Sequence, residues 1–246
     1  MSSAPAHCPA NPMALVLDAK ADGASTSAAA AVAEPAQPLF LVVLDGVETP
    51  IREGTLYGSA GGTVTVTAPG SISAEGLRSV LVRGGGGGEG EEEGGGGSGT
   101  SVRFTLCADA AAEGVGAASF DRCGAARVDG AREVSMLRCR AAEVERAGKV
   151  TLERCRDARL RGGGALRASR CRRADVESFG GVRLARCKAA RLDWCGTVEV
   201  ELCRDVDVAR CGAVTGARCR LVNAAGCGSV AVPHAVVTMM EEEQLQ

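Results

Sequence analysis

The chain has 246 residues, 46% of them apolar, and a formal charge of −2. Only 2% of the residues are aromatic, so the interior must be built from Ala, Val, Leu and Cys, which fill a thin, uniform core better than a thick globular one. No run of eighteen apolar residues exists, so we expect no membrane span.

The N-terminal segment, residues 1–38, is rich in Ala, Pro and Ser and has little periodicity. We predict a disordered leader there, with a partner-binding tail as the alternative. The segment lacks a basic n-region, and its apolar run is too short for a secretory signal. We therefore expect an intracellular protein, cytoplasmic or nuclear, whose twelve cysteines are mostly reduced.

Three further segments lie outside the repetitive body. Residues 39–62 contain the apolar run LFLVVLDGVETPI, bounded by Asp-Gly, which predicts a strand that caps the repetitive body. Residues 87–100 are almost entirely Gly and Glu and predict an extruded loop; their Glu cluster is typical of a solvated charge run rather than a metal site, and no phosphate-binding pattern is present. Residues 237–246 form an acidic tail.

The charges are unevenly distributed between these parts. Residues 101–236 carry 24 basic and 16 acidic side chains, whereas the rest of the chain carries 4 basic and 14 acidic ones. The sequence therefore describes a basic body with acidic appendages.

The body is built from an eight-residue unit. From Ser101 to Val236 the chain divides into seventeen octads without a gap; all have Val, Leu or Ala at the second position, and sixteen are apolar at the fourth. The seventh position holds eleven of the twelve cysteines, and the same frame recurs at residues 63–86. Eight residues drift by about 80° on a helix, so no apolar face would survive. Alternation followed by a turn fits a short strand instead.

Odd and even octads, counted from Ser101, differ in kind, so the true period is sixteen. We predict an all-β, two-sheet parallel β-solenoid over residues 63–236, of either handedness, with about ten coils in a rod of about 50 Å. The third position of the even octads supports this stacking, because its charges alternate in sign and would pair between neighbouring coils. This column contains Arg127, Glu143, Arg159, Asp175, Arg191 and Asp207.

This pattern resembles the short-coil β-solenoids, including the sixteen-residue coils of bacterial ice-nucleation proteins and the insect antifreeze solenoids. The resemblance covers residues 63–236 and implies architecture only: just TVTVT, residues 63–67, looks like a Thr-x-Thr ice-binding ladder, and charged columns would disturb ordered water. The β-helical domain of tubulin-folding cofactor C and cyclase-associated proteins is a more distant likeness, from which no catalytic Arg maps here. The composition also looks like that of accessory proteins of GC-rich large DNA viruses.

The cysteines predict buried columns. Cys is often buried and behaves there as a small hydrophobe. Disulfides between coils are the alternative, since stacked Cα atoms lie about 4.8 Å apart; metal binding would need CxxC-type pairs or a neighbouring His, which are absent from the sequence. The main predicted column contains Cys107, Cys123, Cys139, Cys155, Cys171, Cys187, Cys203 and Cys219, and a shorter one contains Cys195, Cys211 and Cys227.

Basic residues on both sides of these cysteines predict an exposed ridge along one corner of the rod. The simple interpretation is a soluble corner that deters edge association. The functional interpretation is a docking strip for an acidic protein or a nucleic acid. The predicted Arg ridge contains Arg138, Arg140, Arg154, Arg156, Arg170, Arg172, Arg186, Lys188, Arg218 and Arg220.

Catalytic groupings are lacking in the sequence. The two histidines, His7 and His234, lie in the leader and in the last octad, so we predict no enzyme, no catalytic residue, no metal and no cofactor. The leading hypothesis is a protein-interaction module that binds an acidic protein, for example a viral accessory or virulence factor that engages host proteins. A self-assembling structural solenoid and a nucleic-acid binder without sequence readout are the alternatives, although the ridge has almost no aromatics for stacking. We expect a monomer or weak self-association and no membrane partner.

Overall fold

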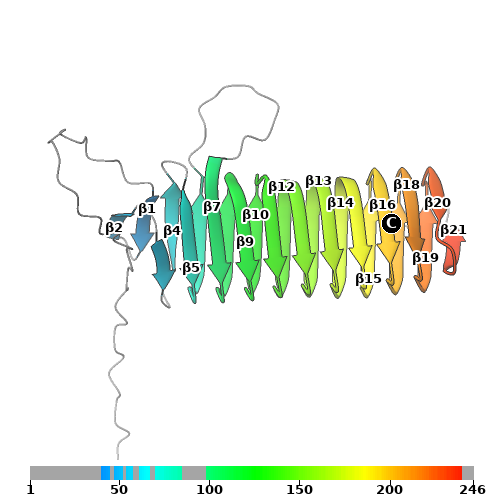
Figure 1. The fold of residues 1–246 in the computed structure, drawn as a ribbon, viewed down its shortest axis with the longest axis horizontal. Helices are drawn as coiled ribbons and strands as arrows, with labels where there is room; N and C mark the ends of the chain where they lie inside the picture. Colours follow the sequence, from blue (N-terminus) through cyan, green and yellow to red (C-terminus); the bar gives the residue numbers. More distant parts are fainter. Residues whose placement is uncertain are drawn as a thin grey trace, which may run out of the picture.

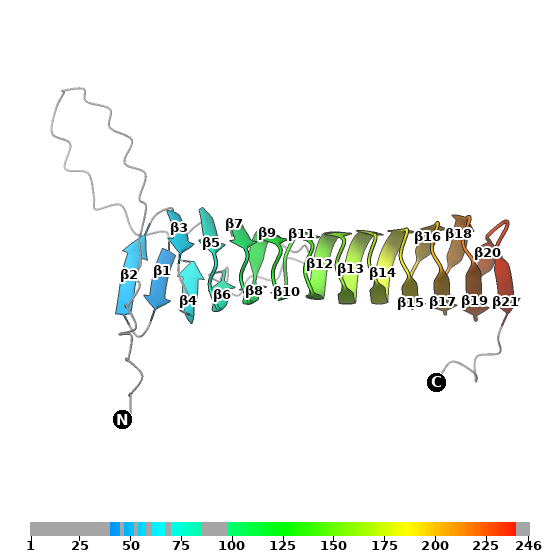
Figure 2. The same cartoon turned by 90° about the horizontal axis from the view of Figure 1, so that it is seen from below.

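A computed structural model describes residues 40–44, 47–51, 54–57, 61–66, 70–84 and 98–239. These residues form one rod of stacked β-coils, along which the chain advances from one end to the other (Figure 1) and which looks straight when seen from below (Figure 2). The part that is described contains no helix able to cross a membrane. The predicted leader, Cys8, most of the Gly/Glu loop and the last seven residues lie outside the described residues.

The rod contains 21 strands in the described residues, most of them five residues long because each octad supplies one strand and one turn. In chain order the strands are β1 (Phe40–Leu44), β2 (Val47–Ile51), β3 (Gly54–Tyr57), β4 (Gly61–Val66), β5 (Ser71–Glu75), β6 (Ser79–Arg83), β7 (Ser98–Thr105), β8 (Asp109–Glu113), β9 (Val115–Asp121), β10 (Ala125–Asp129), β11 (Glu133–Leu137), β12 (Ala141–Glu153), β13 (Asp157–Ser169), β14 (Arg173–Ala185), β15 (Ala189–Asp193), β16 (Thr197–Glu201), β17 (Asp205–Ala209), β18 (Ala213–Ala217), β19 (Leu221–Ala225), β20 (Ser229–Ala231) and β21 (Val236–Met239).

From β7 to β20 the strands stack in parallel with an offset of sixteen residues, which confirms the predicted β-solenoid. On the face built from even octads, Ala142 lies between Ala126 and Ala158 of the neighbouring coils. On the face built from odd octads, Val150 pairs with Val134. The long strands β12, β13 and β14 each run along an even octad, round a corner and into the next odd octad.

The N-terminal end departs from this regularity. β1 pairs antiparallel with both β2 and β4, so the run predicted as one capping strand forms two strands that flank the Asp-Gly dipeptide. Parallel stacking already begins at β3 and β4, and Thr63 pairs with Leu81 rather than with Ser79. The octad frame drawn at residue 63 is therefore wrong by two residues. A two-residue shift keeps the strand alternation in phase, so the apolar pattern alone cannot distinguish the two registers.

Two predicted boundaries also move. β7 starts at Ser98, so the last three residues assigned to the Gly/Glu loop belong to a strand, which is irregular between Ser98 and Ser101. β21 continues to Met239, three residues into the predicted acidic tail, and pairs with β19.

The core is a thin column of side chains from the second, fourth and seventh positions of the octads. Phe104 and Phe120 stack on each other, with ring centroids 4.7 Å apart. The buried Phe179 occupies space left by a glycine in the coil before it, because a Cβ on Gly163 would lie 2.4 Å from a Phe179 ring carbon. A large side chain in one coil thus fills the space that a glycine leaves in the neighbouring coil.

The turn after each strand depends on one left-handed residue. From residue 101 onward, the residue at the sixth position of each octad has a φ between 51° and 67°, whether that residue is Gly, Arg, Leu, Ser, Trp or His. At the corner that follows even octads, four of these residues are glycines, as at Gly130. At the corner that follows odd octads none is a glycine, and six are arginines. The two corners therefore differ in composition although their backbones turn in the same way.

Candidate functional site: an arginine ridge along one corner

The main cysteine column lies inside the corner that follows the odd octads, as predicted. All eight of its side chains are buried and their thiols are free. The Cys139 Sγ lies 3.6 Å from the Leu137 carbonyl oxygen and 3.9 Å from the Phe120 carbonyl oxygen, so the thiol donates to the backbone. The shorter column at the opposite corner is buried at Cys195 and Cys211 and half-buried at Cys227.

The environment of Cys107 and Cys123, the first two cysteines of the column, favours neutral thiols. A hydrogen bond with the Cys123 thiol, followed by burial, raises the pKa of Cys107. The hydrogen bond with Cys107 lowers the pKa of Cys123, but the hydrogen bond with Cys139 and burial outweigh it and raise that pKa to about 11. Since the thiolate is the reactive form of cysteine, these two residues are structural rather than nucleophilic.

The backbone amides on both sides of each ridge cysteine hold the coils together. The Arg138 amide donates to the Glu153 carbonyl of the following coil (2.8 Å), and the Arg140 amide donates to the Cys123 carbonyl of the preceding coil (3.1 Å). The same two bonds recur in the neighbouring coils. Because Cys139 between them points inward, both arginines extend into solvent.

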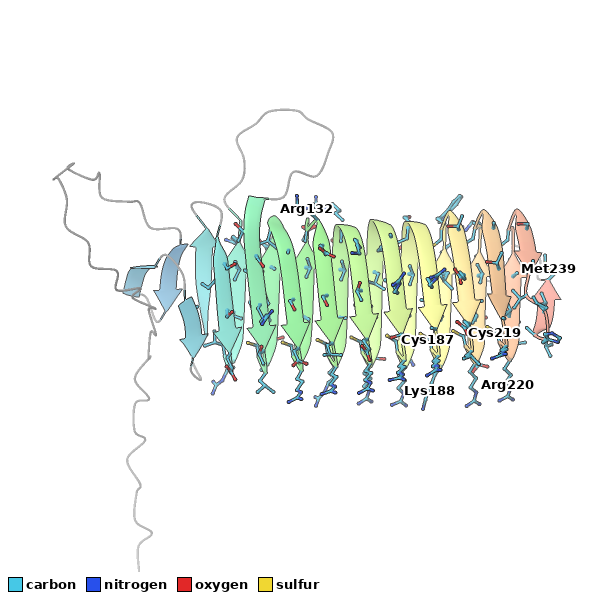
Figure 3. All side chains as sticks on the ribbon, in the orientation of Figure 1. Arg132, Cys187, Lys188, Cys219, Arg220 and Met239 are labelled. Atoms are coloured by element: carbon cyan, nitrogen blue, oxygen red, sulfur yellow. The ribbon has the colours of Figure 1, made fainter. Side chains whose placement is uncertain are left out.

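All ten basic residues of the predicted Arg ridge are exposed at this corner. They form two rows, one from the sixth and one from the eighth position of the odd octads, on either side of the cysteine column. Figure 3 shows Lys188 and Arg220 projecting outward beyond Cys187 and Cys219 along one edge, with Arg132 at the opposite edge.

The structure adds two residues, Arg122 and Arg204, to these rows. Arg122 shares the sixth-position row with Arg138, and Arg204 shares the eighth-position row with Arg220. Sequence reasoning missed them because it required a basic residue on both sides of the cysteine, whereas their partners are Gly124 and Leu202. A search for basic residues at either the sixth or the eighth position of the odd octads, without the requirement for a pair, would have found both. From here on the Arg ridge means these twelve residues.

Five ridge residues are partly neutralised by carboxylates of the same corner. Arg154 lies 3.5 Å from Glu153 and Arg156 lies 3.6 Å from Asp157. Arg122, Arg170 and Arg204 have similar contacts of 3.5 to 4.0 Å. The seven others have no carboxylate partner among the described residues: Arg138, Arg140, Arg172, Arg186, Lys188, Arg218 and Arg220.

A shallow groove of about 330 Å³ runs between the two rows at the N-terminal part of the ridge. Arginines of both rows form its walls, and Gly124 leaves a gap in the eighth-position row, where the next coils carry Arg140 and Arg156. The groove is lined by Arg122, Cys123, Gly124, Arg138, Cys139, Arg140, Arg154 and Arg156.

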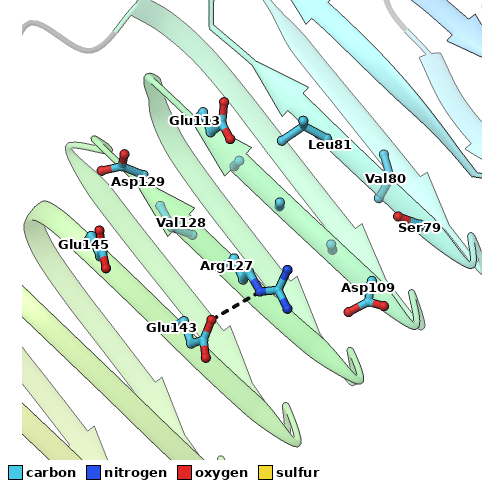
Figure 4. A pocket seen from close by; sticks show the side chains of 13 residues that line it. Ser79, Val80, Leu81, Asp109, Glu113, Arg127, Val128, Asp129, Glu143 and Glu145 are labelled. Atoms are coloured by element: carbon cyan, nitrogen blue, oxygen red, sulfur yellow. Dashed lines mark hydrogen bonds and ion pairs between the residues drawn. The ribbon is translucent and has the colours of Figure 1, made fainter.

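The third-position column of the even face pairs charges of opposite sign between coils, in contrast to the ridge. The predicted alternating column is in register, and Glu143 lies 3.2 Å from Arg127 and 3.9 Å from Arg159. A hollow of about 410 Å³ lies beside Arg127 on this face (Figure 4). Three acidic side chains that are neighbours across the strands line it: Glu113, Asp129 and Glu145.

The corner opposite the ridge is poor in charge and rich in glycine. Its eighth positions are glycine except at Arg132. Two arginines at its sixth positions, Arg146 and Arg210, each reach back to an aspartate of the preceding coil. Arg210 also lies over the exposed Trp194 ring, 4.8 Å from its centre. Unpaired cations therefore gather mainly at the ridge.

Comparison with known proteins does not extend this picture, because no protein family, curated protein or solved structure matches the chain.

Proposed function

We propose that the chain is a non-enzymatic protein-interaction module whose Arg ridge binds an acidic surface of another protein. The observation that carries this proposal is the use of arginine where the fold does not favour it. Six sixth-position residues of the ridge are arginines with φ between 55° and 58°. A left-handed conformation costs an L-residue about 1–2 kcal/mol, which glycine avoids.

Electrostatics adds to this cost. Neighbouring residues of each row are separated by one coil, about 4.8 Å at the backbone, and like charges stacked across strands repel by a few tenths of a kcal/mol per pair. The side chains point outward, so the core does not require arginine at these positions. A binding role for anions accounts for both unfavourable terms, whereas a merely soluble corner could use glycine or alternating charges.

Among anionic partners, protein is favoured over nucleic acid. Proteins that bind single strands usually interleave aromatic side chains with basic ones. The ridge columns contain no aromatic residue between Leu106 and Arg220. We further propose an intracellular setting, as an accessory factor that engages host proteins, because the composition is similar to that of proteins from GC-rich large DNA viruses.

Charge reversal of the ridge tests the proposal. A variant with Arg138, Arg186 and Arg218 changed to Glu should lose the acidic proteins that the wild-type chain captures from a cell lysate. In the matched control, three exposed arginines outside the ridge, Arg103, Arg132 and Arg167, are changed to Glu. This control should still capture the acidic proteins. Circular dichroism verifies that both variants keep their β-structure. Equal capture by the two variants, or capture that is insensitive to salt, would reject the ridge as the binding site.

A further inference from the structure

We infer that the ligand of the Arg ridge is an extended acidic peptide segment that lies parallel to the long axis of the rod. The inference rests on the proposed function and specifies the partner. Three features of the corner support it. Backbone amides of the ridge are bonded to neighbouring coils, the cations form two rows, and only some of these cations have a carboxylate partner at the corner.

The bonded backbone amides restrict the mode of recognition. Extended peptides often bind by adding a strand to a free sheet edge. Along the ridge that route is blocked, because amides such as those of Arg138, Arg140 and Arg154 are already bonded to the neighbouring coil. The outward-pointing side chains remain available for binding. We therefore expect the affinity to come from charge-assisted contacts between guanidinium groups and carboxylates.

The two rows fit an extended chain better than a helix. Side chains of an extended segment point alternately to opposite sides, so successive carboxylates can reach the sixth-position row and the eighth-position row in turn. An acidic helix presents a single stripe of side chains toward the corner, so it serves only one of the two rows. The groove between Arg138 and Arg140 leaves room for the peptide backbone between the rows.

The length of the ridge sets the length of the segment. Six coil steps separate Arg122 from Arg218, which corresponds to about 29 Å at about 4.8 Å per coil. An extended peptide advances by about 3.3 Å per residue, so about nine residues cover the ridge. Longer peptides gain few additional contacts.

The carboxylates at the corner compete with the ligand. Glu153 contacts Arg154 and Arg170, and Asp157 contacts Arg156 and Arg173. The ridge residues without such partners, for example Arg186 and Lys188, are free to pair with the peptide. Removing the competing carboxylates should therefore strengthen binding, whereas removing free cations should weaken it.

The first experiment measures fluorescence anisotropy of labelled oligoglutamate peptides of increasing length with the full chain at low salt. The dissociation constant should fall with length and level off near about nine residues. A stapled helical peptide of equal charge should bind more weakly. Affinity that is independent of length, or tighter binding of the helix, would overturn the inference. So would tighter binding of a single-stranded oligonucleotide of equal charge, because the ridge would then be a nucleic-acid site.

The second experiment uses variants whose predicted effects have opposite signs. R186Q/K188Q should weaken the binding of the nine-residue peptide by about tenfold, as expected for losing two charge-assisted pairs. E153Q/D157N should strengthen it by about threefold, because it releases Arg154 and Arg156. E145Q/D175N removes two carboxylates from the even face and serves as the control, with a change within about twofold. Unchanged or weakened binding by E153Q/D157N would contradict the competition.

The two proposals can fail separately. If no oligoglutamate binds but the wild-type chain still captures acidic proteins in a ridge-dependent manner, the extended-peptide inference fails and the proposed function stands. If capture is also independent of the ridge, both fail.

Discussion

Replacing Arg138 by glycine should stabilise the protein, although it removes a large side chain of the Arg ridge. Arg138 is at a sixth position with a φ of 57° and is exposed. The left-handed conformation costs arginine about 1–2 kcal/mol. Glycine avoids that cost but adds about 0.4–1 kcal/mol of backbone entropy to the unfolded chain. The net gain is about 0.5–1 kcal/mol, since the charged side chain points into solvent and buries little apolar surface.

Thermal unfolding followed by circular dichroism measures this gain. For a chain of this size, 1 kcal/mol corresponds to about 2–4 °C, so the Tm should rise by about 1–4 °C. The control is Leu137→Gly, at a half-buried fifth position outside the residues with positive φ. Glycine there loosens a strand and lowers the Tm. If Arg138→Gly lowered the Tm as much as the control does, the left-handed turn would not be strained and the argument from the ridge arginines would lose its basis.

Three further outcomes are expected. Gly163→Ala should destabilise by about 1–3 kcal/mol in urea unfolding through overpacking against Phe179, and shortening Phe179 should cost less in that background than in the wild type. Stability should decline as the pH rises from about 9 to about 11, because the pKa of Cys123 is raised to about 11 in the folded state and the unfolded thiol ionises first; Cys123→Ala should reduce this decline in urea midpoints measured at both ends of the window. Glu143→Lys should lower stability by a few tenths of a kcal/mol, since it replaces attraction to Arg127 by repulsion, and high salt should reduce the difference.

The period and the inward-facing positions were predictable because every coil repeats the same physical demand. A second-position residue such as Val134 lies between apolar second-position residues of the two adjacent coils, here Ala118 and Val150, so the same strand pattern recurs many times along the sequence. The charge column through Glu143 was predictable for the same reason, since its signs are meaningful only when sixteen-residue coils are in register.

Features that occur once were not predictable in this way. The antiparallel pairing of β1 depends on how the first coil is closed, and no second copy of that pattern exists in the described residues. The left-handed backbone at the sixth position could not be recognised from the sequence. Glycine is the usual sign of this conformation, and thirteen of these residues are not glycine. Arg122 and Arg204 were missed because they lack a basic partner across the cysteine, although the columns contain them.

The charge column of the even face also constrains how such a rod can change its length. Excision of one coil, residues 149–164, would remove Arg159 and place Glu143 beside Asp175, so two acids would become neighbours. Excision of two coils would restore an acid next to a base. The column should therefore tolerate the duplication or deletion of coils best in steps of thirty-two residues, because such a step keeps charges of opposite sign next to each other. This step is twice the length of one coil.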